Sequence, residues 1–329
     1  MTYNVKIASY NTGTKADYSN VHKGQGARTA EIGKKAFSSL AEQNVDLFCL
    51  QEAYNYDDSD IFHTENRWTT DQFDYIRTES GLALVWNNSR FSLIKGSITK
   101  SEDFLIADLY DQTNKKVIRV ASLHIPGYNI ESLQTDDKKK EFDRDVNNGS
   151  SMTAVVKCLG DLLKDKEADF TIVGSDTNSI PKIYDRFHRT FECNGLSYDK
   201  KDQEPTNQYI PPSNENVEGI KDNENVEGKK DDHEKRQIDF IFKSRFLSSK
   251  KEERPEQLNL KNPENPSDHI PVIQTLRMGF FASIFKMISD FFSGKQKPEV
   301  AQKDTFEQPV EVAEDDVFKR ITTQVELRN

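Results

Sequence analysis

The stretch Asn265-Pro266-Ser267-Asp268-His269-Ile270-Pro271-Val272 joins an adjacent acid and imidazole to the start of an apolar run. Prolines at 263, 266 and 271 prevent a helix here and hold the chain in extended or turn geometry. The stretch therefore predicts a strand over 270–276, with the Asp-His pair in the loop before it. A histidine has an ordinary pKa of about 6.5, so it can carry a proton near neutral pH and stabilise negative charge.

Apolar runs upstream of this stretch predict further strands, each with polar side chains at or next to one end. The predicted strands cover 5–10, 45–50, 81–86, 117–123, 170–174 and 237–242. Apolar residues at helical spacing predict helices over 26–43 and 151–166. Strands interleaved with helices indicate an α/β fold, in which functional side chains collect beyond the strand ends.

The polar side chains beside these strand ends share one chemical character. They are Asn11, Glu52, His124, Asp176, Asn178, Asp239, Asp268 and His269. The set has no cysteine and no dense histidine cluster, so a hard, oxygen-preferring cation such as Mg²⁺ suits it better than zinc. A strand-end Asp-x-Asn pair places a proton acceptor and a hydrogen-bond donor on the same side. With a protonated histidine, that pair fits in-line attack of water on phosphorus.

Taken singly, these residues also have ordinary structural interpretations. Asn11 at a strand end is typical of a turn residue. His124 could be a hydrogen-bonded core histidine, and Asp239 could form an ion pair with Arg236. The functional interpretation therefore depends on the whole set.

Six short motifs in one order carry a family resemblance. They are Ser-Tyr-Asn at 9–11, Leu-Gln-Glu at 50–52, Ser-Leu-His at 122–124, Asp-Thr-Asn at 176–178, Gln-Ile-Asp-Phe at 237–240 and Ser-Asp-His at 267–269. Over residues 4–277 the chain resembles the endonuclease/exonuclease/phosphatase superfamily. The resemblance implies a four-layer α/β sandwich, with two mixed β-sheets packed face to face and helices outside. It also implies a metal-dependent phosphoesterase with Mg²⁺ as cofactor and Mn²⁺ as a substitute.

The resemblance assigns the metal and the attacking water to the first part of the set. Glu52 would bind the metal ion, with Asn11 and Asp268 beside it. Asp176 would orient or deprotonate the attacking water. These assignments are implied by matching motif positions.

The remaining residues are assigned by the resemblance to the phosphoryl group. Asn178 and His124 would hold phosphate oxygens. His269, oriented and kept protonated by Asp239, would stabilise the pentavalent transition state, since an adjacent carboxylate favours the imidazolium form.

Departures from the family pattern bear on the fold and on the substrate. The family motif is Gly-Asp-x-Asn, whereas Ser175 here separates Gly174 from Asp176, so a different local turn is expected. Val173 and the run 237–239 stand where inositol 5-phosphatase-like members carry other residues. The Gln-Ile-Asp-Phe pattern is closer to the nuclease and phosphodiesterase branches, which favours a nucleic-acid phosphodiester as substrate.

Other functions are left open by the same residues. They include a membrane-associated phosphoinositide phosphatase, a sphingomyelinase-like phospholipase that binds a lipid head group, and a catalytically inactive binding module. The net charge of −10 argues against a long, sequence-blind basic footprint on nucleic acid, although it allows a local basic rim.

Composition divides the chain into a domain over 1–277 and two C-terminal segments. Residues 203–234 within the domain are polar and contain Asn-Glu-Asn-Val-Glu-Gly twice, which predicts a disordered insertion. Residues 278–293 predict an amphipathic Phe-rich helix, too short to span a bilayer. It could lie in a membrane surface through 278–292 or pack on protein. Residues 294–329 predict a flexible acidic tail.

The N-terminus and the cysteines bear on location. The chain begins without the apolar stretch of a secretory signal. Its three cysteines lack metal-ligand spacing, which favours buried thiols in a reducing compartment. We therefore expect a cytoplasmic protein, with a peripheral membrane location and export by a dedicated secretion system left open.

Overall fold

The computed structural model describes residues 3–13, 37–53, 72–125, 150–164, 168–178, 185–199, 206–208, 235–236, 239–259, 267 and 269–279. The chain divides into two compact units, Met1–Lys295 and Gln296–Asn329, and every described residue belongs to the first. The predicted tail lies outside the described residues, and so does almost all of the predicted insertion and of the Phe-rich helix. Those segments stay predictions.

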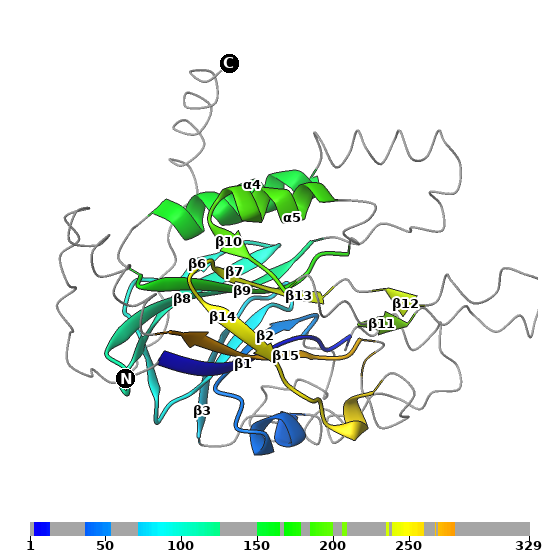
Figure 1. Cartoon of the computed structure of the whole chain (residues 1–329). Coiled ribbons are helices and arrows are strands. Elements are labelled where there is room, and N and C mark those ends of the chain that lie inside the picture. The colour runs from blue at the N-terminus through cyan, green and yellow to red at the C-terminus, as the bar shows by residue number, and fades with distance from the viewer. Residues whose placement is uncertain are drawn as a thin grey trace, which may run out of the picture. The chain divides into compact units, whose positions relative to one another are not determined.

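One sheet, counted over the described residues, has six strands in the order β14-β15-β1-β2-β4-β3 (Figure 1). Their bounds are β1 Tyr3–Asn11, β2 Leu47–Gln51, β3 Phe73–Arg77, β4 Ala83–Asn87, β14 Ser248–Lys251 and β15 Val272–Met278. β1 and β2 are parallel, whereas β15 runs antiparallel to β1. The sheet is therefore mixed.

The second sheet has the order β10-β13-β9-β8-β7-β5 over the same residues, with β6 paired to β7. Its strands are β5 Phe91–Leu93, β6 Thr99–Lys100, β7 Phe104–Asp111, β8 Lys116–His124, β9 Phe170–Asp176, β10 Leu196–Ser197 and β13 Asp239–Ser244. β8 and β9 are parallel, and β13 runs antiparallel to β9. This sheet is mixed too.

Shorter elements complete the description. The helices α4 and α5 cover the outer face of the second sheet, and helical residues 37–42 lie on the outer face of the first (Figure 1). The remaining bounds are α4 Ser150–Lys164, α5 Asp185–Cys193, the 3₁₀ turn η3 Glu256–Leu258, and the two paired strands β11 Asn207–Gln208 and β12 Lys235–Arg236. The predicted four-layer α/β sandwich is confirmed.

Side chains that point alternately to the two faces of each strand form the core between the sheets. On β1, Val5 and Ile7 point toward the second sheet and pack in one cluster with Ile118 and Val120 of β8. Tyr10, on the other face of β1, packs toward helical residues 37–42. Because side chains alternate at a period of two, one strand can serve both layers.

The two sheets come into close contact at Gly174 of β9. A Cβ atom there would lie 2.4 Å from Cβ of Cys49 on β2 and 2.9 Å from Oγ of Ser9 on β1. Such distances do not occur between real side chains, so glycine is required at this position for the sheets to approach.

Most of the predicted elements are found, and the differences have a physical reason. The helix predicted over 151–166 is α4, while the helix predicted over 26–43 is described only from residue 37. The prediction misses β7, whose apolar run is interrupted by Asp108 and Asp111. Both are paired: Asp108 with Arg119 at 2.7 Å, and Asp111 with Arg90 at 2.9 Å. A buried acid with an arginine partner can therefore occupy a central strand.

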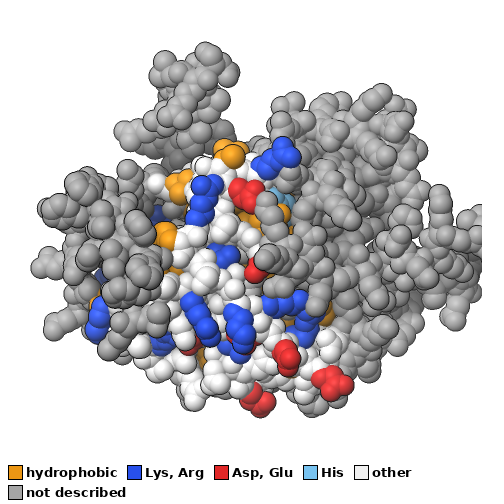
Figure 2. Space-filling model, in the orientation of Figure 1, with side chains coloured by type: hydrophobic (Ala, Val, Ile, Leu, Met, Phe, Trp, Pro, Cys, Tyr) orange, Lys and Arg blue, Asp and Glu red, His pale blue; other side chains and the backbone are white. Residues whose placement is uncertain are grey.

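Surface charge on this unit is mixed. Figure 2 shows Lys and Arg side chains interspersed with Asp and Glu on the face turned to the viewer. Exposed Lys250 lies on β14, at the edge of the first sheet as described, where a charge opposes pairing with another chain. Among the described residues, no helix is long and apolar enough to cross a membrane.

Candidate active site

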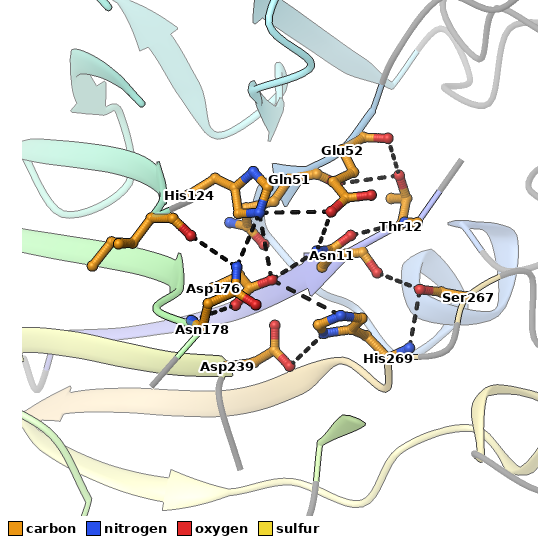
Figure 3. Close-up of polar contacts among 12 residues, drawn as sticks. Asn11, Thr12, Gln51, Glu52, His124, Asp176, Asn178, Asp239, Ser267 and His269 are labelled. Atoms are coloured by element: carbon orange, nitrogen blue, oxygen red, sulfur yellow. Dashed lines mark hydrogen bonds and ion pairs between the residues drawn. The ribbon is translucent and has the colours of Figure 1, made fainter. Parts of the chain in front are cut away.

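Strand directions bring the predicted polar residues to one end of the two sheets. Asn11 and Gln51 are opposite each other at the carboxyl ends of the parallel strands β1 and β2. His124 and Asp176 are opposite each other at the carboxyl ends of β8 and β9. Asp239 begins the antiparallel strand β13 opposite Asp176, so it arrives at the same end. Parallel strands that end together, and antiparallel strands that begin there, thus form the site (Figure 3).

Asn11 connects two carboxylates that come from different sheets. Its Nδ2 donates to Oδ2 of Asp176 at 2.8 Å and to Oε1 of Glu52 at 3.2 Å. Its Oδ1 accepts from N of Gly13 at 2.8 Å, which fixes the amide. Glu52 has a left-handed φ of 51°, a sparsely populated conformation for a residue other than glycine. Such an outlier at a polar site is typical of a functional residue.

His124 lies among these carboxylates. Its Nε2 is 3.6 Å from Oε1 of Glu52 and 3.7 Å from Oδ2 of Asp176. Asn178, with φ 46°, places its Nδ2 3.3 Å from the same ring nitrogen and donates to the carbonyl oxygen of Ile125 at 2.8 Å. His124 is therefore part of this polar group at the strand ends.

His269 and Asp239 form a buried pair beside Asp176. Nδ1 of His269 lies 2.8 Å from Oδ2 of Asp239, and neither side chain is more than 7% exposed. Nε2 of His269 faces Asp176, at 3.9 Å from its Oδ2. Burial raises the pKa of Asp239 to about 6, while the His269 ring beside it acts in the opposite direction. A buried carboxylate of this kind is stabilised by an imidazolium partner.

Supporting residues outside the predicted set hold these side chains in place. Oγ of Ser267 donates to the carbonyl oxygen of Asn11 at 2.7 Å and accepts from N of His269 at 3.1 Å. Nε2 of Gln51 donates to Oγ of Ser122 at 3.0 Å, which ties β2 to β8. Ser267, Gln51 and Ser122 all stand inside the quoted motifs, so the motifs carried a signal for them. Thr206, which contacts Asp239, has no such signal: it falls within the predicted disordered insertion over 203–234, but the structure describes it as a buried residue.

Ser175 is accommodated without a change in the strand. β9 continues in regular register through Asp176, with Ser175 opposite Phe240 and donating to its carbonyl oxygen at 3.3 Å. Gly174 and Asp176 are two residues apart, so both face the first sheet. The local turn begins only after Asp176, where N of Asn178 donates to its Oδ1 at 2.8 Å.

The residues present fit a hard divalent cation. Glu52 and Asp176 direct two carboxylates at one amide and one imidazole, which concentrates negative charge and oxygen ligands. Ligand atoms of Asp176, Asp239 and His269 also lie within 4.8 Å of one another. The hydrogen bond between Asp239 and His269 engages one ligand atom of each, which favours the Glu52 side for a metal. Asp268, the other predicted ligand, lies outside the described residues.

Two mixed sheets packed face to face, with helices outside and polar strand ends together, define the fold of the endonuclease/exonuclease/phosphatase superfamily, as the motifs predict. Solved structures with this fold are similar over most of the chain. The human Nocturnin catalytic domain with bound sulfate aligns at TM-score 0.53 and 15% identity, covering 83% of this chain and 93% of that one.

Two further structures agree with this assignment of the fold. An endonuclease/exonuclease/phosphatase from Bacteroides vulgatus aligns at TM-score 0.51 and 12% identity, covering 84% of this chain and 100% of that one. The 2',3'-cyclic phosphatase ANGEL2, in complex with adenosine-2',3'-vanadate, aligns at 0.50 and 16%, covering 84% and 96%. No family model matches the sequence, and no curated protein matches it.

Proposed function

We propose that this protein is a metal-dependent phosphoesterase that hydrolyses a nucleic-acid phosphodiester by in-line attack of water. The observation that carries the proposal is the position of Oδ2 of Asp176. It lies 2.8 Å from the amide of Asn11, and 3.7 and 3.9 Å from the ring nitrogens of His124 and His269. A carboxylate that can accept a proton thus stands beside two groups that can bear positive charge.

Asp176 is the candidate general base. Its Oδ1 accepts from N of Asn178 and its Oδ2 from Nδ2 of Asn11, so both oxygens have a fixed direction. Each oxygen has a further lone pair for the proton of an attacking water. Because Asp176 is almost fully buried, its position is set by these donors and not by solvent. It would hold the water in line with the phosphorus and take its proton.

His269 is the candidate group that stabilises charge on the phosphoryl oxygens. Its Nδ1–H donates to Asp239, which leaves Nε2–H to face the substrate beside Asp176. His124 and Asn178 would contact phosphoryl oxygens from the other side. These donors are oriented before the reaction, so they need little reorganisation as charge develops. A bound Mg²⁺ or Mn²⁺, held by Glu52 with Asn11 and Asp268, would add Lewis-acid stabilisation of that charge.

Two of the similar structures support a phosphate-like ligand on this fold. The Nocturnin domain holds a sulfate anion, and ANGEL2 holds a vanadate joined to adenosine. The Gln-Ile-Asp-Phe motif at 237–240 points in the same direction, toward nucleases and phosphodiesterases. We therefore favour a nucleic-acid phosphodiester over a lipid head group.

A substrate panel tests the proposal. Single- and double-stranded DNA, RNA, phosphoinositides and sphingomyelin would be incubated with the protein and Mg²⁺ or Mn²⁺, with chelator as a blank. We expect metal-dependent cleavage of a nucleic acid that Asp176→Asn abolishes. The matched control is Asp169→Asn, which changes a partly buried carboxylate just before the other end of β9. Hydrolysis of no phosphoester, or equal rates for wild type and Asp176→Asn, would overturn the proposal.

Association with a membrane through 278–292 is a separate proposal that rests on the sequence. Liposome flotation would compare the full chain with one that ends at Gly279. Truncation at this point keeps β15, whose last residue, Met278, is buried. We expect only the full chain to float with the liposomes. Equal flotation of both chains would refute the proposal that 278–292 binds a membrane surface.

A further inference from the structure

Thr206 lies against the Asp239–His269 pair, although 33 positions separate it from Asp239 in the sequence. Its Oγ1 accepts from N of Asp239 at 3.1 Å. Its carbonyl oxygen accepts from N of Ile270 at 2.8 Å, directly after His269. Thr206 therefore bonds to the backbone N–H of Asp239 and to that of Ile270, the residue directly after His269.

The paired strands β11 and β12 explain how Thr206 reaches this position. Asn207 pairs with Arg236, and Gln208 pairs with Lys235, in an antiparallel register. Thr206 directly precedes this ribbon, and the chain that leaves the ribbon enters β13 at Asp239. The ribbon (β11 and β12 in Figure 1) thus brings its two ends together next to the site.

The contact matters because Asp239 is fully buried at the first position of its strand. A buried backbone N–H needs an acceptor, and the Thr206 hydroxyl supplies one. Burial raises the pKa of Asp239, and a side-chain hydrogen bond with Thr206 acts with His269 in the opposite direction. Thr206 itself is only 3% exposed, so its rotamer is held by its surroundings.

We propose that Thr206 is a positioning residue for the Asp239–His269 pair, holding Asp239 and the backbone after His269 so that Nε2 of His269 faces Asp176. This inference rests on the proposed function only for its kinetic consequence. Asp239 begins β13 and His269 precedes β15, and 30 positions of the chain separate the two residues of this 2.8 Å bond. Thr206 contacts the backbone at Asp239 through its hydroxyl and the backbone after His269 through its carbonyl oxygen.

Kinetics of hydroxyl variants test this role. Thr206→Val keeps the shape and removes the hydroxyl, and we expect kcat to fall about 10- to 100-fold with KM within about twofold. Thr206→Ser restores the hydroxyl and is expected to keep kcat within about threefold of wild type. The matched control is Ser244→Ala at the other end of β13, where Oγ accepts from N of Thr171 at 2.9 Å. That control removes an equivalent bond far from the site, and its kcat should not change.

A second readout does not depend on activity. Ring ¹⁵N chemical shifts of His269, assigned by their loss in His269→Asn, report the Nδ1–H bond to Asp239 in metal-free protein. We expect Thr206→Val to move the Nδ1 resonance and both Thr206→Ser and Ser244→Ala to leave it in place. If the valine variant does not fold, Thr206→Ala makes the same test.

The outcomes separate the two proposals. An unchanged Nδ1 resonance in a folded Thr206→Val variant would overturn the positioning role, whatever the substrate proves to be. So would a kcat that falls equally in Thr206→Val and Ser244→Ala. If the resonance moves but the wild type hydrolyses no phosphoester, the positioning role stands and the proposed function fails.

Discussion

Replacing Asp239 by asparagine should separate catalysis from stability. Asp239 is fully buried, and Oδ2 lies 2.8 Å from Nδ1 of His269. Asp239→Asn keeps the shape but removes the charge that favours the imidazolium form of His269. Positioned acid–base and charge-stabilising groups contribute about 10²- to 10⁴-fold in rate, which is about 2.7 to 5.4 kcal/mol of barrier at about 1.36 kcal/mol per tenfold. We expect kcat to fall within that range.

Stability should respond in the opposite way. Because burial raises the pKa of Asp239 to about 6, the charged carboxylate is costly to bury at neutral pH. Asparagine removes that cost, so the Tm of the variant at pH 7 should equal or exceed that of wild type. A Tm preserved in the variant would show that a loss of activity does not come from unfolding.

Steady-state kinetics with Mg²⁺ on bis-p-nitrophenyl phosphate, or on the substrate that the panel identifies, would measure kcat. Thermal unfolding would measure Tm on the same preparations. Asp169→Asn serves as the control, since it also removes a carboxylate that pairs with a cation, Lys116 at 3.0 Å. A kcat for Asp239→Asn within tenfold of wild type, with Tm preserved, would refute the role of Asp239.

Other measurable consequences follow from burial and packing. Burial raises the pKa of Asp239 to about 6, so falling pH protonates its carboxylate. In the wild type, kcat/KM should therefore decline below about pH 6. The same decline of kcat/KM at low pH in Asp239→Asn would contradict this. Cys193 is exposed, contrary to the expectation that all three thiols are buried. Burial raises the pKa of the Cys49 thiol to about 12. Iodoacetamide at pH 8 should therefore modify Cys193 and spare Cys49 until urea unfolds the chain, as mass spectrometry would show. Gly174→Ala should destabilise the fold by about 1–3 kcal/mol in urea unfolding, because its Cβ has no room. Gly160→Ala on α4, where a Cβ meets nothing within 4 Å, should instead stabilise by about 0.5–1 kcal/mol.

The predicted strands illustrate how far local signals reach. The runs that end at Asn11 and Asp176 alternate or stay apolar over several residues, and a strand that follows such a run has few alternatives. β7 was missed because Asp108 and Asp111 break its apolar run, and their arginine partners lie elsewhere in the chain, Arg119 on β8 and Arg90 in the turn before β5. A pattern limited to neighbours in sequence does not include those partners.

The residue types of the site and their places at strand ends were determined by the sequence alone, because periodicity and turn residues act over a few positions. The close approach of these side chains to one another was decided by the tertiary structure. Asn11 bonds to Asp176 across 165 positions because the two sheets pack face to face. The carboxyl ends of β1 and β9 then lie at the same end of the fold. Thr206 reaches Asp239 only through the pairing of β11 with β12. Strand pairing and sheet contact arise from long-range packing, which no local pattern encodes.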